Sequence, residues 1–211
     1  TGFTRYGKKN VNGSYNTSGA VGTEQPLDTA RHWTLTSSLY MSYDHSKGFV
    51  GAMGDELGLS NINTVHTNAR LGLRYRKDIW SVSLNGMYEG RYTRYKETPQ
   101  YNQDGHTYEV ILSPQVDLPF GMKINAQCIF YTRTGFSDPM LNHDQWIING
   151  SVSQTFLKDK SLTLQLEVTD LLKERTSEFS HLSATSRTFS RTECFLSYVM
   201  LHAIYRLNLG G

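Results

Sequence analysis

The chain has 211 residues, of which 38 % are hydrophobic, and a formal net charge of +2. No apolar run approaches the roughly eighteen residues that a membrane-spanning helix needs, which excludes a helical membrane protein. Charges of both signs are dispersed without a basic stripe, so nucleic-acid binding is not expected. Thirteen Tyr, nine Phe and three Trp make the chain rich in aromatic residues.

The first 29 residues are rich in Gly, Ser, Thr and Asn and predict a loop-rich lead-in with at most one weak strand. From residue 30 to residue 211, apolar and polar side chains alternate in eight segments. A period of two predicts β-strands, because successive side chains point to opposite faces. The strands are expected at 33–43, 71–76, 80–89, 108–118, 122–130, 146–156 and 162–170, with a terminal strand from about residue 191.

The connections between these segments alternate in length. Long polar loops are expected at 45–63, 94–105, 135–142 and 172–189, and short breaks near Lys77, Phe120 and Asp159. Antiparallel outer-membrane barrels have this asymmetry, with short turns on the periplasmic side. The final strand follows a long loop, so the C-terminus is expected in the periplasm.

Two all-β architectures explain the alternation. One is an antiparallel up-and-down transmembrane β-barrel, with lipid outside and water inside, present here as a partial barrel of about eight or nine strands. The other is a soluble sandwich. The sandwich fits less well, because soluble strands usually have five or six residues and because one face of every segment is both apolar and aromatic.

Several stretches resemble one family in combination. They are QTFLKDKSLTL at 154–164, VTDLL at 168–172 and SYVMLHAIYRLN at 197–208, together with LPFGM at 118–122 and RTGFSD at 133–138. From about Trp33 to the C-terminus, the chain resembles the C-terminal barrel segment of TonB-dependent outer-membrane receptors of the Bacteroidetes type.

This resemblance implies a receptor that imports a scarce nutrient, such as an iron chelate, cobalamin, an oligosaccharide or a peptide. Energy would come from an inner-membrane complex acting through a plug domain. A complete barrel of this family has about twenty-two strands around a plugged lumen. We therefore expect a C-terminal sector of the wall, with outer-membrane lipid, the plug and the N-terminal barrel strands as partners, in the outer membrane of a Gram-negative cell.

Two other functions stay open, a small complete barrel with a structural or adhesive role and a barrel-embedded hydrolase. His181 and Ser183 have the His-x-Ser spacing of an outer-membrane phospholipase, but they lie in a polar loop without a catalytic framework. We expect no enzymatic activity and no cofactor. The ligand cannot be read from the sequence.

Other polar residues give weaker signals. His143 and Asp144, with Asp138 nearby, suggest a metal site, but a solvated loop is the favoured interpretation because a four-ligand set cannot be assembled. Glu167 and His202 are expected to point into the lumen and to contact water, plug or substrate. Arg70, Arg74 and Arg76 form a row on a lumen face, where they would meet acidic plug residues or water.

Two further predictions concern the cysteines and the closure of the sheet. Cys128 and Cys194 should not form a disulfide, because three strand spacings of about 4.8 Å separate their strands. The sheet should be open, because the inward side chains are too short and polar to fill a small barrel. The inward set is Thr34, Ser38, Ser81, Ser83, Asn85, Ser113, Asn125, Ser151, Ser153, Thr163 and Thr169; the outward set includes Leu35, Leu39, Leu84, Leu112, Ile124, Val152, Leu164, Leu166, Val199 and Leu201.

Overall fold

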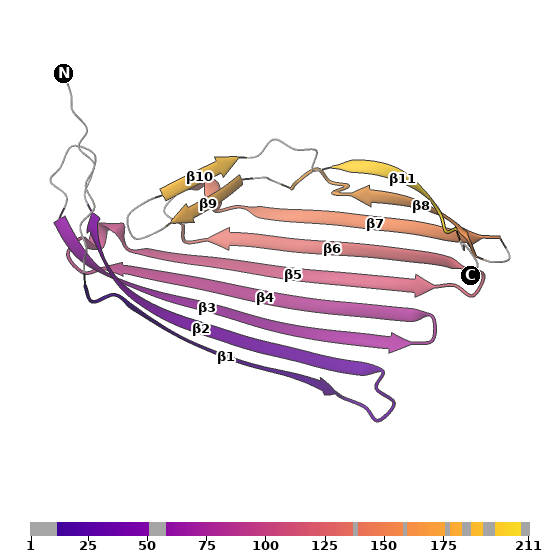
Figure 1. The fold of residues 1–211 in the computed structure, drawn as a ribbon, viewed down its shortest axis with the longest axis horizontal. Coiled ribbons are helices and arrows are strands. Elements are labelled where there is room, and N and C mark those ends of the chain that lie inside the picture. The colour runs from indigo at the N-terminus through magenta and orange to yellow at the C-terminus, as the bar shows by residue number, and fades with distance from the viewer. Residues whose placement is uncertain are drawn as a thin grey trace, which may run out of the picture.

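The computed structural model describes residues 12–50, 58–136, 139–157, 160–175, 178–182, 187–191 and 197–207. Within these residues the chain forms one nine-stranded sheet in the order β1-β2-β3-β4-β5-β6-β7-β8-β11, and a separate two-stranded hairpin, β9-β10 (Figure 1). Every neighbouring pair is antiparallel, which confirms the predicted all-β, up-and-down topology.

The strands of the main sheet are long. Their bounds are β1 Tyr15–Pro26, β2 Trp33–Val50, β3 Gly58–Lys77, β4 Trp80–Tyr95, β5 Gln103–Asp117, β6 Met122–Thr134, β7 Asp144–Phe156, β8 Leu162–Thr169 and β11 Tyr198–Tyr205. The hairpin consists of β9 Glu178–Leu182 and β10 Arg187–Arg191, and two short 3-10 helices are η1 Pro99–Tyr101 and η2 Pro139–Leu141. No helix in the described part of the chain is long and apolar enough to cross a membrane.

Three predicted boundaries are wrong. The loop expected at 45–63 is mostly strand, because β2 continues to Val50 and pairs with β3 from Gly58 onward. The polar loop expected at 172–189 contains β9 and part of β10. Arg191 ends β10, so it does not begin the terminal strand, and β11 starts at Tyr198. Apolar and polar side chains need to alternate only where one face of a strand meets an apolar medium. A strand that continues beyond this region lacks the alternation, so the sequence does not predict that part of it.

Short connections gather at one end of the sheet and longer ones at the other (Figure 1). The β1–β2 turn is closed by Asp28, whose two carboxylate oxygens accept the backbone N–H groups of Trp33 at 2.8 Å and His32 at 3.1 Å. These two hydrogen bonds lower the pKa of Asp28, and the one from Trp33 contributes most. At the same end, Gly121 adopts a φ of +87° between β5 and β6, which favours glycine.

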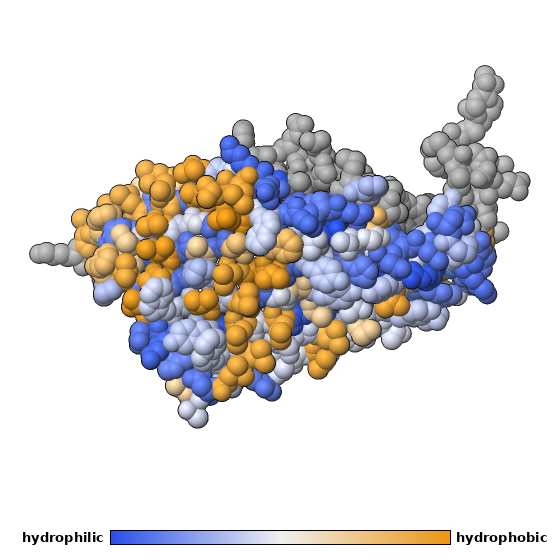
Figure 2. All heavy atoms as spheres, turned by 180° about the vertical axis from the view of Figure 1, so that it is seen from behind, coloured by the Kyte–Doolittle hydropathy of each residue, from blue (hydrophilic) through white to orange (hydrophobic). Residues whose placement is uncertain are grey.

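The register separates an apolar face from a polar face. Leu84 pairs with Leu112, Ile124 with Val152, and Leu166 with Leu201. The apolar side chains are uncovered: Leu71 is 58 % and Leu201 is 71 % exposed. Seen from behind in Figure 2, they gather toward the turn end, and the loop end is polar. No second sheet among the described residues covers them, which argues against the soluble sandwich.

Aromatic residues border the apolar band at both ends. Trp33 packs on Tyr75 with ring centroids 4.6 Å apart near the turns, and Tyr88 lies 5.1 Å from Tyr108 toward the loops. On β4, eight residues separate Trp80 from Tyr88, which is about 27 Å of strand and about 21 Å of height at a tilt of about 40°. That height is close to the apolar band of about 25 Å in outer-membrane barrels.

The sheet is open, as predicted. Within the described residues β11 pairs only with β8, and β1 pairs only with β2. The lead-in contributes one strand of twelve residues, β1, whose residues are all exposed. Cys128 is a free thiol on β6, and Cys194 lies outside the described residues, so the disulfide prediction is not tested.

Candidate functional site

The polar face of the sheet is the candidate site, because its side chains are the ones that could hold a solute or another polar segment. The register places Arg70 opposite Ser38 and Met87, and Arg74 opposite Thr34 and Ser83. The predicted arginine row therefore lies on the polar face. Arg74 forms an ion pair with Glu24 of β1, with Nη2 3.5 Å from Oε1.

A depression of about 450 Å³ lies beside this row, across β2, β3, β4 and β5, and Arg70 and Glu109 contribute to its lining. Gly72, which also lines it, is buried. A Cβ at this position would collide with the hydroxyl of Thr36 and the side-chain oxygen of Asn85. Within the described part of the chain the Arg70 guanidinium has no ion-pair partner, so it remains available to a negatively charged group.

Glu167 and His202 both lie on the polar face, as predicted, and they form an ion pair with His202 Nε2 3.3 Å from Glu167 Oε2. The sequence gives their face but not their pairing, which depends on the β8–β11 register that sets His202 beside Gln165. About a third of each side chain is exposed.

A second His–Glu pair was not found from the sequence. His66 Nε2 of β3 lies 3.2 Å from Glu89 Oε1 of β4, and the ring of Tyr40 meets the His66 ring edge-on at 5.8 Å. His66 lies in the part of β3 that precedes the strand expected at 71–76, which is why the pair was missed.

A fully buried carboxylate organises the segment after β8. Asp170 adopts a left-handed φ of 48°, and its carboxylate accepts the backbone N–H groups of Glu174 at 3.2 Å and Arg175 at 3.0 Å. Its own N–H donates to Asn149 Oδ1 at 2.9 Å. We call residues 170–175 the Asp170 turn. It fixes the backbone of Arg175 beside the polar face.

A second polar depression, of about 320 Å³, lies toward the loop end of β5, β6 and β7. We call it the arginine pocket. Its polar lining consists of Glu109, Tyr131, Arg133, His143, Gln145 and Arg175. Sequence reasoning missed it, because Arg175 comes from a loop and reaches the pocket only through the Asp170 turn.

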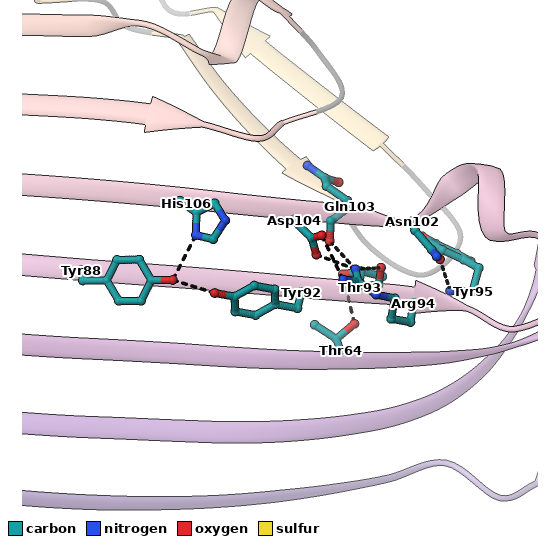
Figure 3. Close-up of polar contacts among 10 residues, drawn as sticks. All are labelled: Thr64, Tyr88, Tyr92, Thr93, Arg94, Tyr95, Asn102, Gln103, Asp104 and His106. Carbon is teal, nitrogen blue, oxygen red and sulfur yellow. Dashed lines mark hydrogen bonds and ion pairs between the residues drawn. The ribbon is translucent and has the colours of Figure 1, made fainter.

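The loop-end hairpin of β4 and β5 is held by polar contacts (Figure 3). Arg94 Nη2 donates to Asp104 Oδ2 at 2.9 Å, which holds the pKa of Asp104 below its ordinary value. The Tyr95 N–H donates to Asn102 Oδ1 at 2.8 Å. On the apolar face the Tyr88 hydroxyl lies 3.0 Å from His106 Nδ1. The hairpin is therefore a fixed extension of the sheet.

The same hairpin is tied to β3 by Glu97. Its Oε2 accepts the N–H of Asn61 at 2.6 Å and the hydroxyl of Ser60 at 3.0 Å. Hydrogen bonds to the Glu97 carboxylate, chiefly those from Asn61, lower the pKa of Glu97 to about 2.

The two weaker candidate sites, the His-x-Ser motif and the possible metal site, are only partly described by the structure. Ser183 and Asp138 lie outside the described residues, and for His181 only the backbone is described. Among the described residues no group of three His, Cys, Asp or Glu side chains lies close enough to hold a metal ion. His143 instead lies with its Nε2 2.7 Å from Gln145 Nε2, at the rim of the arginine pocket.

The open antiparallel sheet, its lipid-compatible apolar band and its polar opposite face define the wall of an outer-membrane β-barrel. The outer membrane protein beta-barrel family matches residues 59–205, and the chain belongs to this family. Neither the curated proteins nor the solved structures that were compared with the chain gave a match. The polar face is thus the lumen face of a barrel wall in the outer membrane.

Proposed function

We propose that this chain is a sector of the barrel wall of a TonB-dependent receptor that takes up a nutrient actively across the outer membrane. The observation that carries the proposal is the open sheet. Nine strands leave both edges unpaired within the described residues, and the lumen face presents short polar and charged side chains that suit a wide, occupied lumen.

The arginine row supports a plug in that lumen. Arg70 is exposed and lines the depression over Gly72. A guanidinium in the wall of a barrel needs water or an acidic partner. An acidic side chain on a plug would be such a partner, and energy transmitted through the plug from an inner-membrane complex could then break the contact.

The proposed orientation places the short turns and the C-terminus in the periplasm and the longer loops outside the cell. The apolar band, which lies nearer the turns than the loops (Figure 2), supports this arrangement, because outer-membrane barrels have short periplasmic turns and longer extracellular loops.

The test is nutrient accumulation by cells that express the full-length protein. Cells are given labelled ferric chelates, cobalamin, oligosaccharides and peptides, with and without a protonophore. The proposal expects at least one compound to accumulate above its outside concentration, and the accumulation to collapse when the protonophore is added. Accumulation that survives the protonophore, or none with any of the four classes, would contradict active uptake.

A matched pair of variants tests the wall's part in this uptake. Arg70→Glu reverses a charge on the lumen face, whereas Lys77→Glu reverses an exposed charge at the turn end of the same strand. We expect Arg70→Glu to lower accumulation at an unchanged amount of protein in the outer membrane, and Lys77→Glu to leave accumulation as it is. Equal effects of the two variants would refute a specific role of the arginine row.

A further inference from the structure

The arginine pocket has an excess of positive charge. Among the residues that line its space of about 320 Å³, Arg133 and Arg175 carry a positive charge and Glu109 carries a negative one. This is near the lower end of the volumes of ligand pockets, roughly 300–1,000 Å³, and so suits one functional group of a solute better than a whole large ligand.

Arg133 is held in place on several sides. Its Cζ lies 5.1 Å from the ring centroid of Tyr131 and 6.0 Å from that of Phe136. Its backbone N–H donates to the carbonyl oxygen of His143 at 3.1 Å. Its Nε is buried and has no hydrogen-bond partner in the described part of the chain. A buried donor without an acceptor is unfavourable, and an anionic oxygen would satisfy it.

Arg175 is positioned by a different element. The buried carboxylate of Asp170 binds the Arg175 N–H at 3.0 Å, and the N–H of Leu171 donates to the carbonyl oxygen of Ile148 at 2.8 Å. The Asp170 turn therefore ties the backbone of Arg175 to β7. The Arg133 side chain and the Arg175 backbone are thus held by independent elements, which reduces the entropy lost when both arginines bind one anion.

We propose that the arginine pocket is a subsite for an oxyanion, a carboxylate or a phosphate, carried by a small solute that enters the lumen from the loop side. Guanidinium groups bind both kinds of oxyanion through paired, charge-assisted hydrogen bonds. Tyr131 and Gln145 complete the polar lining of the pocket beside the two arginines. The side from which the solute enters depends on the proposed orientation. The preference for an anion rests on the proposed function and specifies the chemical class of the nutrient.

The experiment measures protection of individual arginines in the purified full-length protein. Phenylglyoxal modifies accessible guanidinium groups, and peptide mass spectrometry reports the rate at Arg133, Arg175 and Arg70 separately. The probes are citrate and inorganic phosphate, at ionic strength held constant with sodium chloride. The proposal expects at least one probe to protect Arg133 and Arg175 together, with half-protection on the order of 1 mM, while Arg70 reacts at an unchanged rate.

Two variants sharpen this result. Arg133→Gln should raise the half-protecting concentration at Arg175 about tenfold, whereas Lys173→Gln, which removes an exposed charge from the same turn, should leave it unchanged. Protection by citrate alone or phosphate alone supports the pocket and identifies the oxyanion. Absence of protection by both probes, equal protection of Arg70, or equal effects of the two variants would overturn the proposal.

The outcomes separate this inference from the proposed function. Active uptake without protection of Arg133 and Arg175 would remove the subsite and leave the receptor. Protection in a protein that accumulates no nutrient would leave the subsite and remove the receptor.

Discussion

A charged residue on the apolar face of β5 should destabilise the protein far more than the same residue one position along the strand. Leu112 pairs with Leu84 and lies four residues from both Val116 and Tyr108, whose partners Trp80 and Tyr88 border the apolar band. It is therefore close to the middle of the band. Ser113 has the same depth, but it faces the lumen.

Arginine at the midplane of a barrel's lipid face costs about 2–4 kcal/mol of stability. Leu112→Arg should thus lower the folding equilibrium constant roughly 30- to 700-fold, since 1.4 kcal/mol corresponds to a factor of ten. Ser113→Arg enters a hydrated lumen and should change the free energy of unfolding by no more than about 0.5 kcal/mol, as solvated substitutions usually do.

The assay is urea unfolding of the full-length protein in lipid vesicles, followed by tryptophan fluorescence. Leu112→Trp serves as a third variant. Lipid accommodates the larger ring, whereas a packed protein core would lose about 1–3 kcal/mol to overpacking. The reasoning would be refuted if both arginine variants lost the same stability, or if Leu112→Trp destabilised as strongly as Leu112→Arg.

Three further predictions concern single groups. Asp170→Ala should cost about 1–3 kcal/mol because it removes the buried carboxylate that accepts the N–H groups of Glu174 and Arg175; hydrogen exchange should show those two amides, and few others, exchanging faster. The lowered pKa of Glu97, about 2 against an ordinary 4.5, means that its stabilising contribution is complete above about pH 4.5 and is lost as the pH falls toward 2. The Asn61 amide should lose protection over that range, and Glu97→Gln should abolish the pH dependence; protection that stays constant with pH would contradict this. Gly72→Ala should cost no more than about 0.5 kcal/mol, because the atoms that a Cβ would meet are the Thr36 hydroxyl and the Asn85 amide oxygen, two side-chain ends that can rotate away; a loss of several kcal/mol in urea unfolding would contradict this.

The sequence predicts the sheet well where each strand separates lipid from water. Leu84, Leu112 and Leu164 lie on the expected face. Where side chains alternate strictly, only one assignment of the two strand faces puts all the apolar residues toward lipid. The prediction fails where both faces are polar. His45 and Asn63 lie in strands, with His45 Nδ1 2.7 Å from Asn63 Oδ1, yet nothing in their neighbourhood alternates.

The lumen face was predicted in part. Its residue types follow from alternation, so Arg70, Glu167 and His202 could be placed on it. The contacts that matter chemically depend on register and on loops. The Glu167–His202 pair needs the β8–β11 register, and Arg175 reaches the arginine pocket only because Asp170, which reads as an ordinary turn residue, is buried and binds its backbone.

We propose above that this sheet is one sector of the wall of a larger barrel. An experimental structure of the full-length protein in lipid tests it most directly, through the hydrogen-bond partners of β1 and β11. We expect that the free edge of each strand, at Val21 and at Leu201, pairs with a strand formed outside residues 15–205. A ladder between β1 and β11 themselves, closing a nine-stranded barrel, would contradict it.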